Sequence, residues 1–348
     1  VLHTGQAQIR GGRFAAESAI TRCARLGALA HGGQILVSNA TADLLADELP
    51  PEVAVVPLGL HRLRGLGRPE RVFQLSHPAM PARFPPLRSL DMLPNNLPAQ
   101  LTSFVGREAE LAELGRLVDR TRMVSLVGAG GCGKTRLAAQ VAADVAEAHP
   151  DGVWWVDLAP LSDPAQVPQA VLAAMGIGDT RGRDASERLT VFLADQRVLL
   201  VLDNCEHVVA AASGLLDSAL RACPNLVALA TSREPLGLPG ELVWRVPPLS
   251  LPAQGETLGV GRLDAYDAVR LFIERAVAAL PSFQVDNDSA PTVADICSRL
   301  DGIPLAIELA AARVRTLSLD RVRDALTDRF RLLTGGARTV MPRQQTLQ

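Results

Sequence analysis

The sequence has 348 residues, of which 48% are hydrophobic and 21% are charged, so it is long enough for two or three domains with buried cores. Its formal net charge of −2 excludes an overall electrostatic attraction to nucleic acid or to an anionic membrane. Five widely spaced cysteines without a C-x-x-C pair argue against a disulfide framework or a zinc site. No apolar run reaches the ~18 residues of a membrane span, so we expect a cytoplasmic protein without a membrane partner.

The first 77 residues predict a small α/β unit. Its expected strands are 4–9, 34–38, 53–58 and 71–75, and its expected helices are 15–30 and 39–49, the second capped by Asn39 or Thr41. Residues 78–100 are rich in proline and lack periodicity, which predicts a linker.

Residues 101–250 alternate short apolar strands with helices, and this alternation predicts a parallel sheet covered on both faces. The strands are expected at 123–127, 152–158, 197–203 and 225–231, and the helices at 134–148, 164–175, 184–195 and 207–222. Residues 251–338 carry apolar residues at helical spacing only, which predicts an appended all-α domain. The chain begins with valine and stops in residues 339–348 without a clear terminal element, so we expect a piece of a longer protein.

The stretch "GAGGCGKT" fits the phosphate-binding loop G-x-x-x-x-G-K-[ST], and it lies between a predicted strand and a predicted helix. Its glycines let backbone N–H groups face phosphate oxygens at the positive end of the helix. Lys134 is the only lysine among 35 basic residues, and a compact ammonium suits the β- and γ-phosphates of ATP or ADP. The nucleotide-binding residues predicted here are Gly128, Gly130, Gly131, Cys132, Gly133, Lys134, Thr135 and Arg136.

A second apolar strand, "VLLVLD", ends in Asp203, which is the expected carboxylate on the Mg²⁺ side, while the Thr135 hydroxyl is the expected Mg²⁺ ligand. Asn204 follows, and an amide cannot act as a base, so slow hydrolysis is expected. Glu206 is either a catalytic base that reaches in from the next turn or a cap of the next helix. Arg233 follows the strand at 225–231, where it is placed to sense a γ-phosphate.

The chain from about 101 to 338 resembles the signal-transduction ATPases with numerous domains (STAND), the group that includes the NB-ARC proteins and many bacterial regulators. The resemblance lies in "FVGREAEL", the phosphate loop, "LLVLDNCEH", "ATSRE" and "LDGIPLAIELAAAR". It implies a switch that ADP holds closed and ATP opens. It also implies that Val105, Gly106 and Arg107 line the adenine side, that Pro304 packs on the base and that Arg233 senses phosphate.

The first 77 residues resemble the carboxyl-terminal half of a class III nucleotidyl cyclase domain, a ferredoxin-like α/β unit, on "LHTGQAQI", "TRCARLGALAHGGQILVSNAT" and "PLGLHRLRGLGRPERVFQL". The family's transition-state Asn is replaced by Thr21, whereas its Arg is present as Arg25, and the segment with the metal-binding aspartates is absent. The resemblance therefore implies a non-catalytic unit, with a homo-oligomer or a cyclase-domain partner left open.

Two other functions remain as alternatives at this stage. An adenylate cyclase would need the missing aspartates. A DNA-binding protein could meet phosphate through the basic stretches at 61–71 and 313–331, but the second interleaves its arginines with Asp320, Asp324 and Asp328, which is more typical of a solvated helix face. By resemblance, a DNA-binding regulator would act through a C-terminal helix-turn-helix module that we expect to be missing from this chain. By resemblance, residues 339–348 look like the start of a winged helix.

Overall fold

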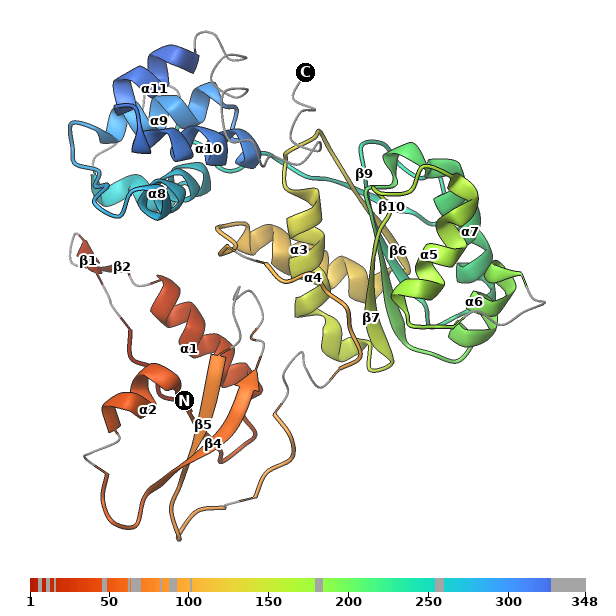
Figure 1. Ribbon diagram of the computed structural model, residues 1–348, viewed down its shortest axis with the longest axis horizontal. Coiled ribbons are helices and arrows are strands. Elements are labelled where there is room, and N and C mark those ends of the chain that lie inside the picture. Colours follow the sequence, from red (N-terminus) through yellow and green to blue (C-terminus); the bar gives the residue numbers. More distant parts are fainter. Residues whose placement is uncertain are drawn as a thin grey trace.

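The computed structural model contains an N-terminal unit, a central sheet with helices and a C-terminal group of helices (Figure 1). Residues 327–348, which hold the end of the predicted helical domain and the predicted start of a winged helix, lie outside the described residues. The structure describes residues 1–5, 8–10, 13–15, 17–45, 49–61, 63, 70–81, 83–87, 93–100, 102–178, 184–253 and 260–326.

The central sheet is parallel, with the strand order β10-β6-β9-β8-β7 within the described part of the chain. Every residue of β6 and β8 is buried, as expected for strands that are covered on both faces. This arrangement confirms the predicted α/β fold of the P-loop type. The strands are β6 Met123–Val127, β7 Gly152–Asp157, β8 Val198–Asp203, β9 Val227–Ser232 and β10 Leu242–Arg245.

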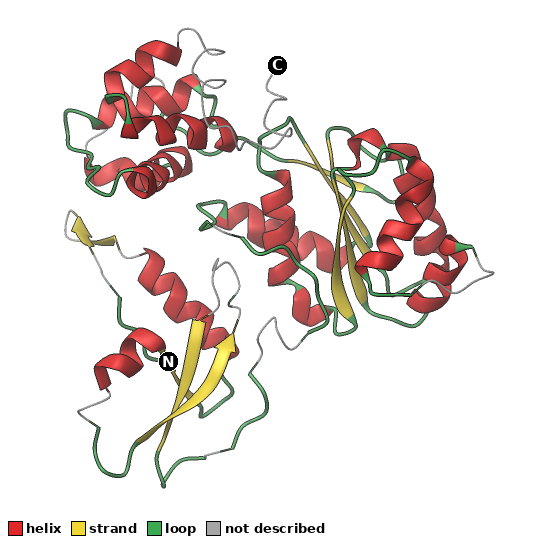
Figure 2. Ribbon diagram, viewed as in Figure 1, coloured by secondary structure: helices red, strands yellow, loops and turns green. Residues whose placement is uncertain are grey.

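Two sets of helices pack on opposite faces of this sheet (Figure 2). Helices α3 (Glu108–Arg120) and α4 (Lys134–Asp144) share a core with Leu199 and Val201 of β8. The alternate β8 residues, Leu200 and Leu202, pack on the other side against helices α5 to α7. These helices are α5 Val167–Ala174, α6 Ala185–Leu193 and α7 Val209–Ala222.

Two elements of this domain were not predicted from the sequence. Strand β10 is short and half-buried at the edge of the sheet, so it lacks the continuous apolar run of its neighbours. Helix α3 overlaps the "FVGREAEL" motif, and its buried stripe includes Leu114 and Val118. The helix predicted at 134–148 ends at Asp144 and is followed by a 3-10 turn at Ala146–Ala148.

The C-terminal helices form a core of their own around Phe272, whose ring meets Phe283 edge-on at a centroid distance of 6.4 Å. Within the basic stretch weighed as a DNA contact, Arg323 pairs with Asp320 at 3.2 Å and with Asp324 at 3.1 Å. These pairs are typical of a solvated helix face. The helices are α8 Asp267–Ala279, α9 Ala290–Arg299, α10 Pro304–Ala311 and α11 Leu319–Ala325.

The N-terminal unit has an antiparallel sheet of order β3-β5-β4 with two helices, and the strands predicted at 34–38, 53–58 and 71–75 lie in this sheet. The strand predicted at 4–9 does not: within the described residues it overlaps only β1, which pairs with β2. The predicted cap of the second helix was wrong, because the Ser38 hydroxyl accepts a hydrogen bond from the Thr41 backbone amide at 3.4 Å. The Asn39 side-chain amide instead donates to the Asp43 carboxylate at 2.7 Å. The elements are β1 Gln8–Arg10, β2 Arg13–Ala15, α1 Glu17–Leu29, β3 Ile35–Ser38, α2 Asn39–Leu45, β4 Ala54–His61 and β5 Glu70–Ser76.

Strand β4 lies at the edge of that sheet. It contains Pro57, which has no N–H to donate, and its register with β5 shifts between Pro57 and Gly59. A proline and a bulge are features that protect edge strands from pairing. Among the described residues, this edge therefore offers little support for a partner strand.

The segment predicted as a linker contacts both of its neighbours. Leu87 belongs to the core of the N-terminal unit. At the other end, Asn95 forms a parallel bridge with Val153, and the Trp155 amide donates to the Asn96 side chain at 2.6 Å. Residues 94–97 therefore extend the edge of the central sheet beside β7.

Candidate functional site

The phosphate loop joins the end of β6 to the start of α4, as the motif requires. Gly131 and Gly133 have φ values of +76° and +93°, which L side chains rarely adopt. A Cβ at Gly131 would also stand 3.0 Å from the Leu305 Cβ. These positions therefore favour glycine, and the loop backbone stands at the N-terminus of α4, where N–H groups can face an anion.

Lys134 lies over this loop. Its ammonium donates to the carbonyl oxygens of Gly128 at 2.8 Å and Ala129 at 3.0 Å. The slim side chain is thus positioned at the loop rather than in an ion pair with a carboxylate. An ammonium in this position can bind a phosphate oxygen as a point charge.

Thr135 and Asp203 meet at the carboxyl end of the sheet, where the Thr135 hydroxyl donates to Asp203 Oδ1 at 2.8 Å. Thr231, at the end of β9, donates to the same oxygen at 2.5 Å and accepts the Asn204 amide at 2.9 Å. The sequence did not single out Thr231, although it lies within the "ATSRE" motif. Thr231 lies near the end of buried strand β9, which neighbours the strand that ends in Asp203. A hydroxyl in that position is the signal that could have identified it.

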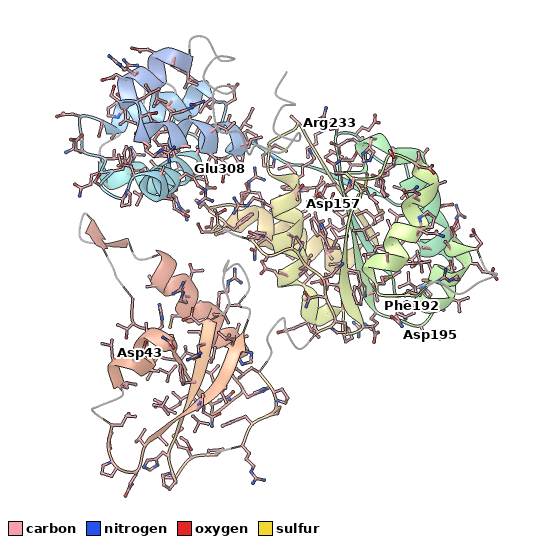
Figure 3. The ribbon with its side chains drawn as sticks, viewed as in Figure 1. Asp43, Asp157, Phe192, Asp195, Arg233 and Glu308 are labelled. Carbon is pink, nitrogen blue, oxygen red and sulfur yellow. The ribbon has the colours of Figure 1, made fainter. Side chains whose placement is uncertain are left out.

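Glu206 and Arg233 form an ion pair across the ends of β8 and β9, with Arg233 Nε 3.4 Å from Glu206 Oε1. The other carboxylate oxygen of Glu206 is buried and has no hydrogen-bond partner. Among the described residues, therefore, Glu206 does not form the helix-capping bond that was one of its two predicted roles. Figure 3 shows Arg233 and Asp157 at the same end of the sheet.

Arg107 is buried between the phosphate loop and the C-terminal helices. Its guanidinium donates to the Cys132 carbonyl at 2.8 Å and the Pro247 carbonyl at 2.9 Å, and its backbone amide donates to Asp267 at 3.2 Å. Nη1 is buried without a partner, and burial lowers the pKa of the group. Gly106 fits tightly, because a Cβ there would collide with the Asp267 carboxyl group.

Helix α10 begins against the phosphate loop. The Leu305 amide donates to the Gly131 carbonyl at 3.2 Å, and Pro304 lies 3.7 Å from the position of a Cβ on Gly133. Val105 packs against the core of the C-terminal helices. The structure thus brings Pro304 close to the loop, while its predicted packing on the base stays a prediction.

Arg136 is also close to the loop, but its side chain turns toward the C-terminal helices. It donates to Glu308 at 3.1 Å and to the Ser103 carbonyl at 2.6 Å, and Arg275 donates to the same carboxylate at 2.9 Å. Burial lowers the pKa of Arg136, and Glu308 partly opposes that shift. Glu308 therefore joins the first turn of α4 to α8 and α10.

The residues present fit a nucleotide with Mg²⁺. The loop needs its glycines, the orphaned Nη1 of Arg107 lies at the loop, and the hydroxyl and carboxylate of Thr135 and Asp203 are the hard oxygen ligands that Mg²⁺ takes. Within the described ranges, no cluster of three or more His, Cys, Asp or Glu could hold a metal without a nucleotide.

The predicted cyclase pair lies outside this site. Thr21 is exposed on α1, and Arg25 is 3.5 Å from Asp144 at the end of α4. An ordinary ion pair with the neighbouring domain accounts for Arg25 in this structure. None of the helices in the described part of the chain is long and apolar enough to cross a bilayer.

Comparison with known proteins matches residues 109–211 to the NB-ARC domain. An uncharacterized protein of Mycobacterium tuberculosis is 47% identical over 247 residues, which cover 71% of this chain and 60% of that protein. Another protein of that organism, whose name assigns it provisionally to the HTH-type transcriptional regulators, is 46% identical over 232 residues, or 67% of this chain and 25% of its own length. The chain thus spans 60% or less of the length of these relatives.

A solved STAND protein with a tetratricopeptide repeat sensor, from Pyrococcus horikoshii, aligns with 65% of this chain and 32% of its own, with a TM-score of 0.39 and 16% identity. The fold assignment rests on the strand order of the sheet and not on this distant neighbour.

Proposed function

Because residues 109–211 match the NB-ARC domain, we propose that this chain is an ADP- and ATP-binding signalling switch with slow hydrolysis, and part of a bacterial transcriptional regulator. The observation that carries the proposal is the junction at the phosphate loop. Lys134 donates to the Gly128 carbonyl of this loop, and the Leu305 amide at the start of α10 donates to its Gly131 carbonyl. A nucleotide in the loop would therefore contact both domains, and its phosphates would affect how they dock.

Each residue of the site has a role in binding the nucleotide. Lys134 and the loop amides bind the β- and γ-phosphates, and Thr135 and Asp203 hold Mg²⁺, which supplies charge neutralisation on the phosphates. Val105, Gly106, Arg107 and Pro304 border the base.

Slow hydrolysis follows from the residues after β8. Asn204 cannot take a proton from water, and its backbone is held by Thr231 in a left-handed conformation with φ of +65°. Glu206 is the remaining candidate base, but it faces Arg233. We expect turnover far below the ~10 s⁻¹ median of enzymes.

We also propose the domain limits. Residues 1–77 are a non-catalytic cyclase-like unit, 101–250 the nucleotide-binding domain and 251–338 the helical domain, with 78–100 between the first two and 339–348 opening a winged helix. DNA binding would belong to a module beyond these domains. The similarity to a relative named for HTH-type regulation supports the role in transcription.

The proposal is tested by thermal unfolding with and without Mg-ADP or Mg-ATP. Ligand at about a hundredfold excess over Kd should stabilise the protein by about 2.7 kcal/mol. Lys134→Ala should abolish the shift, whereas Arg221→Ala, at an exposed pair on α7, should retain it. A shift that persists in Lys134→Ala would place the nucleotide elsewhere.

A further inference from the structure

The ion pair between Glu206 and Arg233 lies just beyond the carboxyl ends of β8 and β9, the edge of the sheet where Thr135 meets Asp203. Arg233 directly follows β9, and Glu206 lies in the turn after β8, two residues beyond the Asn204 amide that Thr231 holds. Thr231 in turn bonds Asp203, which bonds Thr135 at the phosphate loop. This chain of hydrogen bonds ends at Asn204 and Thr231, each of which stands two residues before a member of the ion pair.

Burial of the Glu206 carboxylate favours its ion pair with Arg233. One carboxylate oxygen is buried without a hydrogen-bond partner, and the other lies 3.4 Å from Arg233 Nε. A partly desolvated carboxylate favours a nearby positive charge. The Arg233 side chain is half exposed, at 50%, so its guanidinium is also open to an arriving anion.

We propose that Glu206 is an internal competitor of the γ-phosphate for Arg233, and that it thereby sets the preference of the site for the diphosphate over the triphosphate. With ADP, Arg233 stays with Glu206, because the diphosphate has no γ-phosphate to offer it. With ATP, the γ-phosphate must draw Arg233 away from Glu206, which costs the free energy of the ion pair. Glu206 is then a specificity-determining residue, whether or not it also acts as a base.

The inference rests on the proposed nucleotide site, and the experiment separates the two. Affinities for Mg-ADP and for a non-hydrolysable Mg-ATP analogue are measured by calorimetric titration, so hydrolysis does not enter. The proteins are the wild type, Glu206→Gln, Arg233→Gln, the double variant and, as a matched exposed pair far from the site, Asp217→Asn.

Glu206→Gln should strengthen binding of the ATP analogue by about two- to fivefold, the range of ion pairs this exposed, and leave ADP binding nearly unchanged. Arg233→Gln should weaken the ATP analogue selectively. In the Arg233→Gln background, Glu206→Gln should no longer change the ratio of the two affinities, because the arginine for which Glu206 and the γ-phosphate compete is gone. Asp217→Asn should match the wild type.

Two results would overturn the inference while leaving the proposed function intact. One is an unchanged affinity ratio in Glu206→Gln. The other is an equal change in the presence and absence of Arg233, which would show a general effect of removing a negative charge near polyanionic ligands. If the wild type bound neither nucleotide, the proposed function itself would fail.

Discussion

Replacing Thr231 by valine tests the geometry of the site most sharply, because the two side chains have the same shape and differ in one hydroxyl. Thr231 is 1% exposed, and its hydroxyl donates to the Asp203 carboxylate, which is 2% exposed, while accepting the Asn204 amide. A hydrogen bond to a charged group contributes about 1.5–3 kcal/mol, and a buried amide left without a partner costs about 1–3 kcal/mol. We expect a loss of about 2–4 kcal/mol in the free energy of unfolding of the sheet domain.

The three tryptophans suit this measurement, because Trp154 and Trp155 lie on β7 and Trp244 lies on β10. Denaturant unfolding followed by their fluorescence therefore reports on the sheet and not on the other domains. Thr231→Ser keeps the hydroxyl and is the matched control, with the loss of one methyl group as its main change. If Thr231→Val were as stable as Thr231→Ser, the hydrogen-bonded chain from Thr135 to Asn204 would not have the strength that its burial implies.

Three further predictions concern the junction, the loop and pH. Glu308→Gln removes the carboxylate shared by two arginines, which should lower the free energy of local opening at the start of α10 by about 1–2 kcal/mol. Amide hydrogen exchange there should therefore become about 5- to 30-fold faster. The control Asp295→Asn, at an exposed ion pair, should change this exchange rate less than threefold. Gly131→Ala forces a side chain into a left-handed position 3.0 Å from Leu305, so nucleotide-dependent stabilisation should be lost, and full retention would show that the loop tolerates a Cβ. Burial lowers the pKa of His149 below 6.5, so the unfolded chain binds the extra proton more readily, and the free energy of unfolding should fall as pH drops below about 6.5. His149→Gln should weaken this dependence of stability on pH, and an unchanged dependence would contradict the prediction.

Much of the fold could be predicted because its strands are short, apolar and buried on both faces. Strand β6 was predicted at its observed limits, since five buried residues stand between a polar turn and the glycine loop. Strand β10 was missed because an edge strand needs only one covered face and one neighbour, so its sequence carries a weaker pattern. Tertiary packing, not local sequence, places it beside β6.

In the candidate site, too, some residues could be predicted from the sequence and some contacts could not. Lys134, Thr135 and Asp203 follow from motif and strand position, and the structure brings Thr135 and Asp203 together. The contact of Arg136 with Glu308 joins residues 172 positions apart, and no local pattern encodes such a pair. The ion pair between Glu206 and Arg233 could not be predicted either. The sequence suggests a separate role for each residue, and only the folded structure shows that the two side chains meet.

The most direct measurement is the nucleotide that remains bound to the purified protein. The protein is denatured, and the released nucleotide is identified and quantified against protein concentration, in the wild type and in Lys134→Ala. We predict close to one ADP or ATP per chain in the wild type and almost none in a folded Lys134→Ala variant. A wild type that carries no nucleotide and takes up none at saturating Mg-ADP, or a Lys134→Ala variant that stays fully loaded, would contradict the account.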